Sequence, residues 1–114
     1  MKPGEIYDLY FPFKTPIKPG QEMGKIRPAL ILAVSSSGTA LALSLKITGT
    51  GPTSEYPYRI PIFFWRDANL DKPSYVELDT EMPIRIISRQ YPRGELKPAD
   101  FNNVLKEYRK YKLG

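Results

Sequence analysis

The chain of 114 residues contains no cysteine and no histidine. Without cysteine there can be no disulfide, no thiolate nucleophile and no cysteine-ligated zinc. Without histidine, the chain lacks the usual acid–base group near neutral pH and the commonest transition-metal ligand. We therefore expect neither a metal nor a cofactor, and any catalysis must use arginine, lysine, carboxylates, hydroxyls or the backbone.

Long apolar runs are missing as well. No hydrophobic stretch approaches the length needed to span a membrane, and the start, Met-Lys-Pro-Gly-Glu, has no apolar signal core. We expect a soluble protein that stays in the cytoplasm, and the length suits one domain over residues 1–114. The net charge is +5, which favours polyanionic partners, although many basic proteins bind none.

Twelve prolines and eight glycines indicate many short segments rather than long helices. The clearest strand pattern is 39–48, where Leu41, Leu43, Leu45 and Ile47 alternate with small or polar residues. Further strands are expected from composition and from the intervening turn signals. They span 6–13, 28–34, 58–65, 74–79 and 84–88. Pro61 within 58–65 predicts an edge strand or a bulge.

The last segment changes to helical spacing. Phe101, Val104, Leu105 and Tyr108 recur with the period of a helix, and Pro98 stands where its first residue should be. Short strands followed by one C-terminal helix indicate a mainly β domain, which we expect to be a small barrel.

Arg27 and Thr48 are the residues whose placement suggests chemistry. Arg27 stands directly before the strand 28–34, and Thr48 ends the next one. If the two strands are antiparallel neighbours joined by the turn at 35–38, both residues lie at the same end of the sheet. Each has an ordinary explanation by itself: an arginine paired with a surface carboxylate, and a threonine that ends a strand.

The loop before this strand adds charge to the same end. It carries Lys14, Lys18 and Lys25, with Glu22 as a nearby carboxylate. Lys46 shares a strand face with Thr48, since residues two apart in a strand point the same way. Together these residues predict a cationic rim that suits a phosphodiester.

RNA would make such a rim sufficient for chemistry. Its 2′-hydroxyl is an internal nucleophile, so the protein need only align it, handle one proton and stabilise charge on the phosphate. The planar fork of arginine fits phosphate oxygens. Single-stranded RNA also stacks on aromatic side chains, for which Tyr56, Tyr58 and Trp65 flank suitable loops, although we expect at least two of the three to be core.

Five segments, in order, resemble the MazF/PemK-type toxins of bacterial toxin–antitoxin systems. They read "GEIYDLYFPF", "EMGKIRPALIL", "LKITGTGPTSEYPYRIPI", "NLDKPSYVELD" and "GELKPADFNNVLKEYRKYKLG". The resemblance implies a partly open SH3-like barrel with a C-terminal helix, and a homodimer. It also implies metal-independent, sequence-specific cleavage of single-stranded RNA such as mRNA, which inhibits growth, and neutralisation by a cognate antitoxin protein.

The resemblance carries over to individual residues. Arg27 matches the catalytic arginine, Thr48 the active-site threonine and Glu22 a loop glutamate proposed to assist in some members. Asp71 matches an aspartate with a role in one branch, whose arginine two residues earlier is Asn69 here. We expect RNA contacts from the basic rim and one tyrosine, namely Lys14, Lys18, Lys25, Lys46 and Tyr56.

Two alternatives remain at this point. The same barrel in CcdB-type toxins poisons DNA gyrase by protein contact, although such a binder does not need the Arg27/Thr48 pair. The chain could instead be an RNA-binding module that does not cleave.

Overall fold

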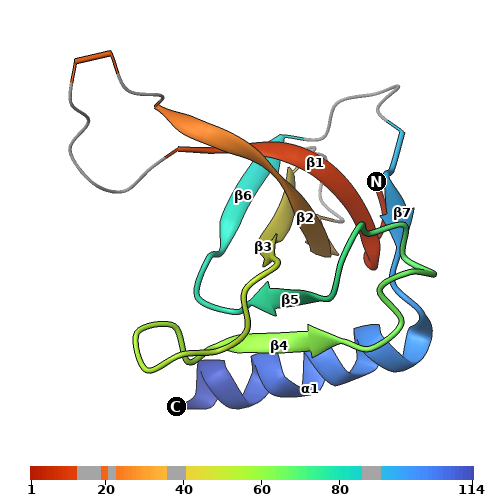
Figure 1. Ribbon diagram of the computed structural model, residues 1–114. Helices are drawn as coiled ribbons and strands as arrows, with labels where there is room; N and C mark the ends of the chain where they lie inside the picture. The colour runs from red at the N-terminus through yellow and green to blue at the C-terminus, as the bar shows by residue number, and fades with distance from the viewer. Residues whose placement is uncertain (13–18, 21–22, 36–40, 86–90) are drawn as a thin grey trace.

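The computed structural model describes residues 1–12, 19–20, 23–35, 41–85 and 91–114. It contains seven strands and one helix within these ranges (Figure 1). In chain order these are β1 (Glu5–Pro12), β2 (Gly24–Val34), β3 (Leu41–Thr48), β4 (Arg59–Ile62), β5 (Ser74–Glu77), β6 (Met82–Arg85), β7 (Gly94–Glu95) and α1 (Pro98–Leu113). The strands are ordered β4-β5-β3-β2-β1-β7, and β6 also pairs with β3.

Strand β3 is the centre of this sheet, because it changes partners along its length. Its residues 41–46 pair with β2 and β6, whereas Ile47 and Thr48 pair with Val76 and Tyr75 of β5. All these pairings are antiparallel. The change of partners curls the sheet, and α1 runs along β4 on one side of it (Figure 1). The predicted mainly β fold with a C-terminal helix is confirmed.

Strand β2 is longer than the sequence indicated. It begins at Gly24 rather than at Pro28, so Arg27 lies inside the strand and not ahead of it. The pairs between β2 and β3 run only from Ala29 onward, so residues 24–28 pair with β1 alone. This part forms a two-stranded ribbon that projects from the body (Figure 1). Pro28 is accommodated because one of its sides has no strand partner.

The main hydrophobic core lies between the curled sheet and the helix. It contains Leu30 and Leu45 from the central strands, Val76 from β5 and Val104 from α1, all fully buried. Leu43 and Ile47 also face this core, as the alternation predicted. Leu41, at the start of β3, does not pack against the core and is 44% exposed.

The opposite face of β3 is also buried, which its small and polar residues did not predict. Ala42 packs in a second cluster with Tyr7 and Ile31. Ser44 is fully buried, and its hydroxyl donates a hydrogen bond of 2.9 Å to the carbonyl of Met82. The bond satisfies a polar group that would otherwise be costly inside the protein.

The helix begins at Pro98, as predicted, and Lys97 provides no side-chain cap. Asp100 in its first turn is 1% exposed and accepts hydrogen bonds from the backbone N–H groups of Phe63 and Phe64, at 3.0 and 2.9 Å. The helix is thereby fixed to the chain that leaves β4.

Some strand bounds differ from the prediction. Strand β4 ends at Ile62, because Phe63 begins a compact turn, and β6 starts at Met82 within the predicted loop. The short β7 was not predicted. Pro61 lies on an edge strand, as expected. The remaining parts of the predicted strands, Phe13, 39–40 and 86–88, and most of the turn at 35–38 lie outside the described residues.

In the described part of the chain, no helix is long and apolar enough to cross a membrane.

Candidate active site

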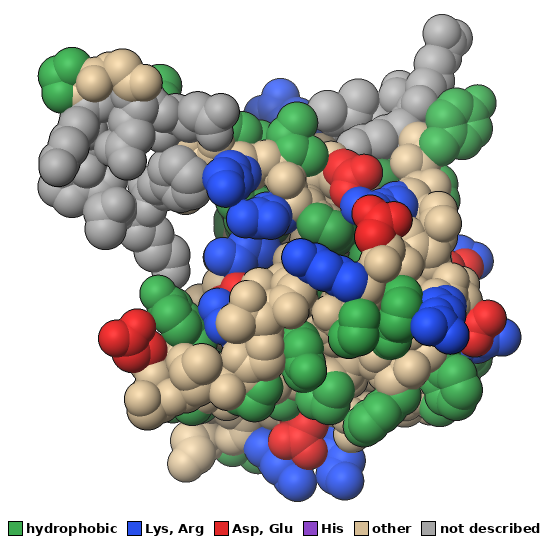
Figure 2. All heavy atoms as spheres, viewed as in Figure 1, with side chains coloured by type: hydrophobic (Ala, Val, Ile, Leu, Met, Phe, Trp, Pro, Cys, Tyr) green, Lys and Arg blue, Asp and Glu red, His purple; other side chains and the backbone are tan. Residues whose placement is uncertain are grey.

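A cavity of about 280 Å³ lies where the ribbon of β1 and β2 meets the end of β3. Four of its lining residues are charged: Arg27, Lys72 and Arg93 carry positive charges, and Asp71 carries a negative one. The others are Ile26, Pro28, Ile47, Thr48, Gly49, Leu70 and Ser74. Three cations against one carboxylate make this cavity suitable for an anionic ligand. Basic side chains also gather on the face drawn in Figure 2, over the middle of the sheet.

Arg27 reaches the cavity from the projecting ribbon. Its cross-strand partner is Leu9, and it is exposed, as are Lys25 and Ile26 beside it. Consecutive residues are exposed because neither face of the ribbon is covered at this point. Within the described part of the chain, no carboxylate forms an ion pair with Arg27. Its guanidinium therefore keeps its hydrogen-bond donors available for a ligand.

Thr48 reaches the cavity from the end of β3. The last pair between β2 and β3 joins Ala29 and Lys46, two residues from Arg27 and Thr48, and beyond it Thr48 pairs with Tyr75 of β5. The two strands are antiparallel neighbours, as the sequence argument required, and both residues line the same cavity. The Thr48 hydroxyl accepts a long hydrogen bond of 3.4 Å from the N–H of Thr50, which leaves its own proton free to donate.

Asp71 lines the same cavity from the segment that connects β4 with β5. Its side chain is 89% exposed, and its Oδ2 accepts a hydrogen bond of 2.8 Å from Nη2 of Arg93. Nη1 of Arg93 donates to Oδ1 of Asp8 at 3.0 Å. Burial lowers the pKa of Arg93, but the hydrogen bonds and charges of Asp8 and Asp71 outweigh it, so the pKa is raised above its ordinary value. Arg93 stays charged at any pH of interest.

Lys72 lies against the turn that follows Thr48. A Cβ atom added to Gly49 would collide with the end of the Lys72 side chain, so the glycine leaves room for the lysine. The lysine ammonium therefore lies next to the residue that follows Thr48, and it adds a positive charge to the cavity that Arg27 also lines.

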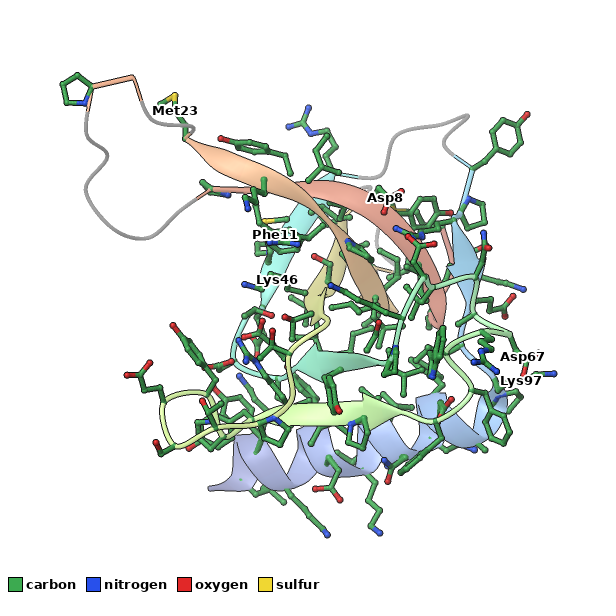
Figure 3. The ribbon with its side chains drawn as sticks, in the orientation of Figure 1. Asp8, Phe11, Met23, Lys46, Asp67 and Lys97 are labelled. Carbon is green, nitrogen blue, oxygen red and sulfur yellow. The ribbon has the colours of Figure 1, made fainter. Side chains whose placement is uncertain are left out.

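The expected RNA-binding residues are not all in one place. Lys25 is exposed on the ribbon. The ammonium of Lys46, labelled in Figure 3, lies 3.3 Å from Oε1 of the buried Glu77, and the Arg59 guanidinium lies 3.6 Å from Oε2 of the same carboxylate. Lys46 is thus engaged in an ion pair within the protein and does not line the cavity.

Tyr56 is exposed, and one face of its ring is covered by the guanidinium of Arg59, 4.4 Å from the ring centre. The other residues expected at the rim, Lys14, Lys18 and Glu22, lie outside the described residues.

The expectation that two of the three loop aromatics are core residues is wrong. Tyr56 and Tyr58 are 48% and 45% exposed, and Trp65 is only partly buried against the core. Tyr58 lies beside Tyr111 of α1, with ring centres 4.8 Å apart. These aromatics remain on the surface because the chain between β3 and β4, and the turn after β4, run outside the sheet.

Two lining residues, Lys72 and Arg93, were not singled out from the sequence. Lys72 stands next to Asp71 and could have been found from that position. Arg93 offers no comparable signal, since it lies 22 residues after Asp71 and only the fold brings the two together.

The comparisons with known proteins agree with this architecture. A family model described as "PemK-like, MazF-like toxin of type II toxin-antitoxin system" matches residues 2–111. No curated protein matches the sequence.

Several solved structures share the fold. An endoribonuclease in complex with its cognate antitoxin from a mycobacterial species has a TM-score of 0.64 and 20% identity, covering 96% of this chain and 92% of that one. The MazE–MazF complex from Deinococcus radiodurans has a TM-score of 0.63 and 24% identity, with 97% and 90% covered. MazF from the same organism has a TM-score of 0.64 and 19% identity, with 100% and 97% covered.

Since the family model spans nearly the whole chain and the fold is that of MazF, the chain belongs to the PemK-like, MazF-like toxins of type II toxin–antitoxin systems.

Proposed function

We propose that this chain is a sequence-specific endoribonuclease that cleaves single-stranded RNA, mRNA in the cell, without a metal ion. The 2′-oxygen attacks the adjacent phosphorus, and the bond from phosphorus to the 5′-oxygen of the next nucleotide breaks. The products are a 2′,3′-cyclic phosphate and a free 5′-hydroxyl. One proton leaves the 2′-oxygen and one is delivered to the departing 5′-oxygen, so the reaction consumes no other reagent.

The observation that supports this proposal is the meeting of Arg27 and Thr48 in one cavity with further cations. Arg27 would hold two phosphate oxygens with its planar fork and stabilise the charge that grows on them in the transition state. The Thr48 hydroxyl would donate to a phosphate oxygen or orient the 2′-hydroxyl. Alignment of an internal nucleophile can supply a large part of the rate.

Several groups could handle the two protons. Asp71 is the carboxylate that lines the cavity and can accept a proton, and Glu22 is a second candidate from the sequence resemblance. Arg27 could deliver the proton to the leaving oxygen. The pH–rate profiles of Asp71→Asn and Arg27→Ala, compared with that of the wild type, would distinguish among these groups.

The test is cleavage of a mixed pool of single-stranded RNA by the purified protein in the presence of EDTA, with the RNA ends sequenced. Arg27→Ala should reduce the rate at least about 10²-fold, the scale for losing one transition-state charge partner. Arg109→Ala, an exposed arginine on α1 away from the cavity, is the matched control and should cleave like the wild type.

The outcomes separate the alternatives. A DNA pool of the same sequences should remain intact, since it lacks the 2′-hydroxyl. Salt-sensitive retention of RNA without cleavage would support a binding module instead. Capture of DNA gyrase by a protein that does not cleave RNA would support a gyrase poison. Full activity of the Arg27→Ala variant would rule out the role given to Arg27.

We also propose that the chain forms a homodimer and binds a cognate antitoxin. The support is the family membership and the two solved relatives that were crystallised with their antitoxins. Light scattering on the purified chain measures the dimer. Expression of the chain alone should stop bacterial growth, and co-expression of a short acidic protein encoded beside it should restore growth.

A further inference from the structure

Arg93 lies where three segments of the chain meet, namely β1, the segment that ends at Asp71 and the residues before β7. It directly precedes β7, and its backbone N–H donates a hydrogen bond of 2.7 Å to the carbonyl of Ile6 in β1. Its side chain is only 22% exposed although it lies at the rim of a cavity. An arginine that is mostly covered at a cavity rim needs partners for its charge.

The guanidinium has a partner in each direction. Nη2 donates to Oδ2 of Asp71 at 2.8 Å, Nη1 to Oδ1 of Asp8 at 3.0 Å, and Nε to the carbonyl of Asn69 at 3.1 Å. Asp8 belongs to β1, where it pairs with Pro28, a residue that lines the cavity. Arg93 therefore links the strand beside Arg27 to the segment that carries Asp71.

The backbone at Asn69 and Gly94 allows the segments that carry Asp71 and Arg93 to approach closely. Asn69 has a positive φ of 61°, which asparagine tolerates better than most residues. Its side-chain amide donates back to the carbonyl of Arg93 at 2.7 Å, so the two residues are joined in both directions. A Cβ atom at Gly94 would collide with the carbonyl of Ala68, so only glycine allows the two segments to approach this closely.

Asp71 depends on this arrangement for its position. Its side chain is 89% exposed, and Arg93 is the residue of the described chain that bonds to it. An unpaired carboxylate in this place would turn freely in solvent. With Oδ2 held by Arg93, the carboxylate is fixed at the rim of the cavity, and Oδ1 is left for a ligand or a proton.

We propose that Arg93 is a positioning residue, which fixes the Asp71 carboxylate at the cavity that Arg27 and Thr48 also line. The inference rests on the proposed cleavage of RNA. It adds that the reaction depends on Asp71 and that Arg93 acts through Asp71. Direct binding of the substrate phosphate by Arg93 is disfavoured, because its side chain is only 22% exposed and its positive charge is already paired with Asp8 and Asp71, although two of its five N–H donors remain.

The test is a double-mutant cycle on a short single-stranded RNA that contains the mapped cleavage site. Asp71→Asn and Arg93→Gln should each reduce kcat by about 10-fold, as expected when a reacting group is misplaced. The double variant should be no slower than Asp71→Asn alone, within about 2-fold, because Arg93 has nothing left to position. Arg109→Gln is the matched control, and Arg93→Lys should recover part of the activity.

Binding distinguishes positioning from direct contact with the substrate. The same RNA with a 2′-deoxyribose at the cleavage site binds without reacting. Arg93→Gln should change its Kd by less than about 3-fold, whereas loss of a direct phosphate contact would weaken binding by 10-fold or more. Thermal unfolding of each variant shows whether its rate is measured on folded protein. If Arg93→Gln does not fold, Arg93→Lys takes its place in the double-mutant cycle.

Three results would overturn the inference. Independent effects that multiply in the double variant would mean that Arg93 does not act through Asp71. Weakened binding of the deoxy substrate would make Arg93 a binding residue. Full activity of Asp71→Asn would leave nothing to position. In each case the wild type still cleaves, and the proposed function stands; a wild type that cleaves no RNA overturns the function and the inference together.

Discussion

Replacing Asp100 by alanine should destabilise the whole fold, because this one carboxylate joins the helix to the chain that leaves β4. Asp100 is 1% exposed, and its two oxygens accept the N–H groups of Phe63 and Phe64. A hydrogen bond to a charged group contributes about 1.5–3 kcal/mol. Both N–H groups are partly buried, so we take the lower half of that range for each, which gives about 3–4 kcal/mol for the pair.

Two smaller effects nearly cancel. Alanine has a higher helix propensity than aspartate by about 0.5 kcal/mol, whereas a negative charge in the first turn contributes about 0.3–1 kcal/mol. The expected loss in the free energy of unfolding is therefore about 3 kcal/mol. At about 4 °C for each kcal/mol in a chain of this size, the melting temperature should fall by about 12 °C.

The assay is urea unfolding, followed by circular dichroism for the helix and by the fluorescence of Trp65 for the adjoining turn. Coincident transitions show that the two-state treatment applies. Asp67→Ala is the matched control, since this aspartate is exposed in the same turn (Figure 3) and its loss should change stability by less than about 0.5 kcal/mol. A loss below about 1 kcal/mol in Asp100→Ala would refute the argument that these two hydrogen bonds secure the helix.

Two further predictions concern Tyr7 and Gly94. Burial, together with its hydrogen bond to Glu5, raises the pKa of Tyr7 from 10.0 to about 12. The folded protein thus favours the neutral phenol. This contribution to stability is complete below pH 10.0, the pKa of the tyrosine in the unfolded chain. It is lost as the pH rises toward about 12, the pKa of Tyr7 in the folded protein. Urea titrations across that window should show the loss, and Tyr7→Phe should lack this component. Gly94→Ala should cost about 1–3 kcal/mol in the same assay, since the new methyl group meets the rigid carbonyl of Ala68, whereas Gly49→Ala, which meets a flexible lysine, should cost less.

The meeting of Arg27 and Thr48 could be predicted from the sequence because it depends on local features. Strand alternation and one turn bring two consecutive strands together, and antiparallel pairing then places the end of one beside the start of the other. The cavity they share follows from the same pairing. The exact start of β2 could not be predicted. A proline usually marks the end of a strand, and Pro28 is tolerated inside β2 only because β3 does not pair with it, which the sequence does not show.

Other features could not be predicted because they depend on distant contacts. Strand β7 has only two residues, too few for any periodic pattern, and it is defined by its pairing with β1. The exposure of Tyr56 and Tyr58 depends on the path of a loop, and an aromatic side chain alone favours the core. The pairing of Lys46 with Glu77 likewise required the neighbouring strand to be known.

The two sides of the cavity differ in what fixes them. Arg27 and Thr48 come from adjacent strands of one hairpin. The segment that ends in Asp71 is secured at both ends by residues that follow it in the chain: Asp100 binds its start at Phe63 and Phe64, and Arg93 binds its end. Between these anchors the segment has its own backbone bonds, from Ala68 to Phe64 and from Leu70 to Trp65. The carboxylate can therefore face the arginine only when β7 and α1 are docked. The position of the carboxylate thus depends on both anchors, whereas Arg27 lies on the projecting ribbon, where β2 pairs with β1 alone.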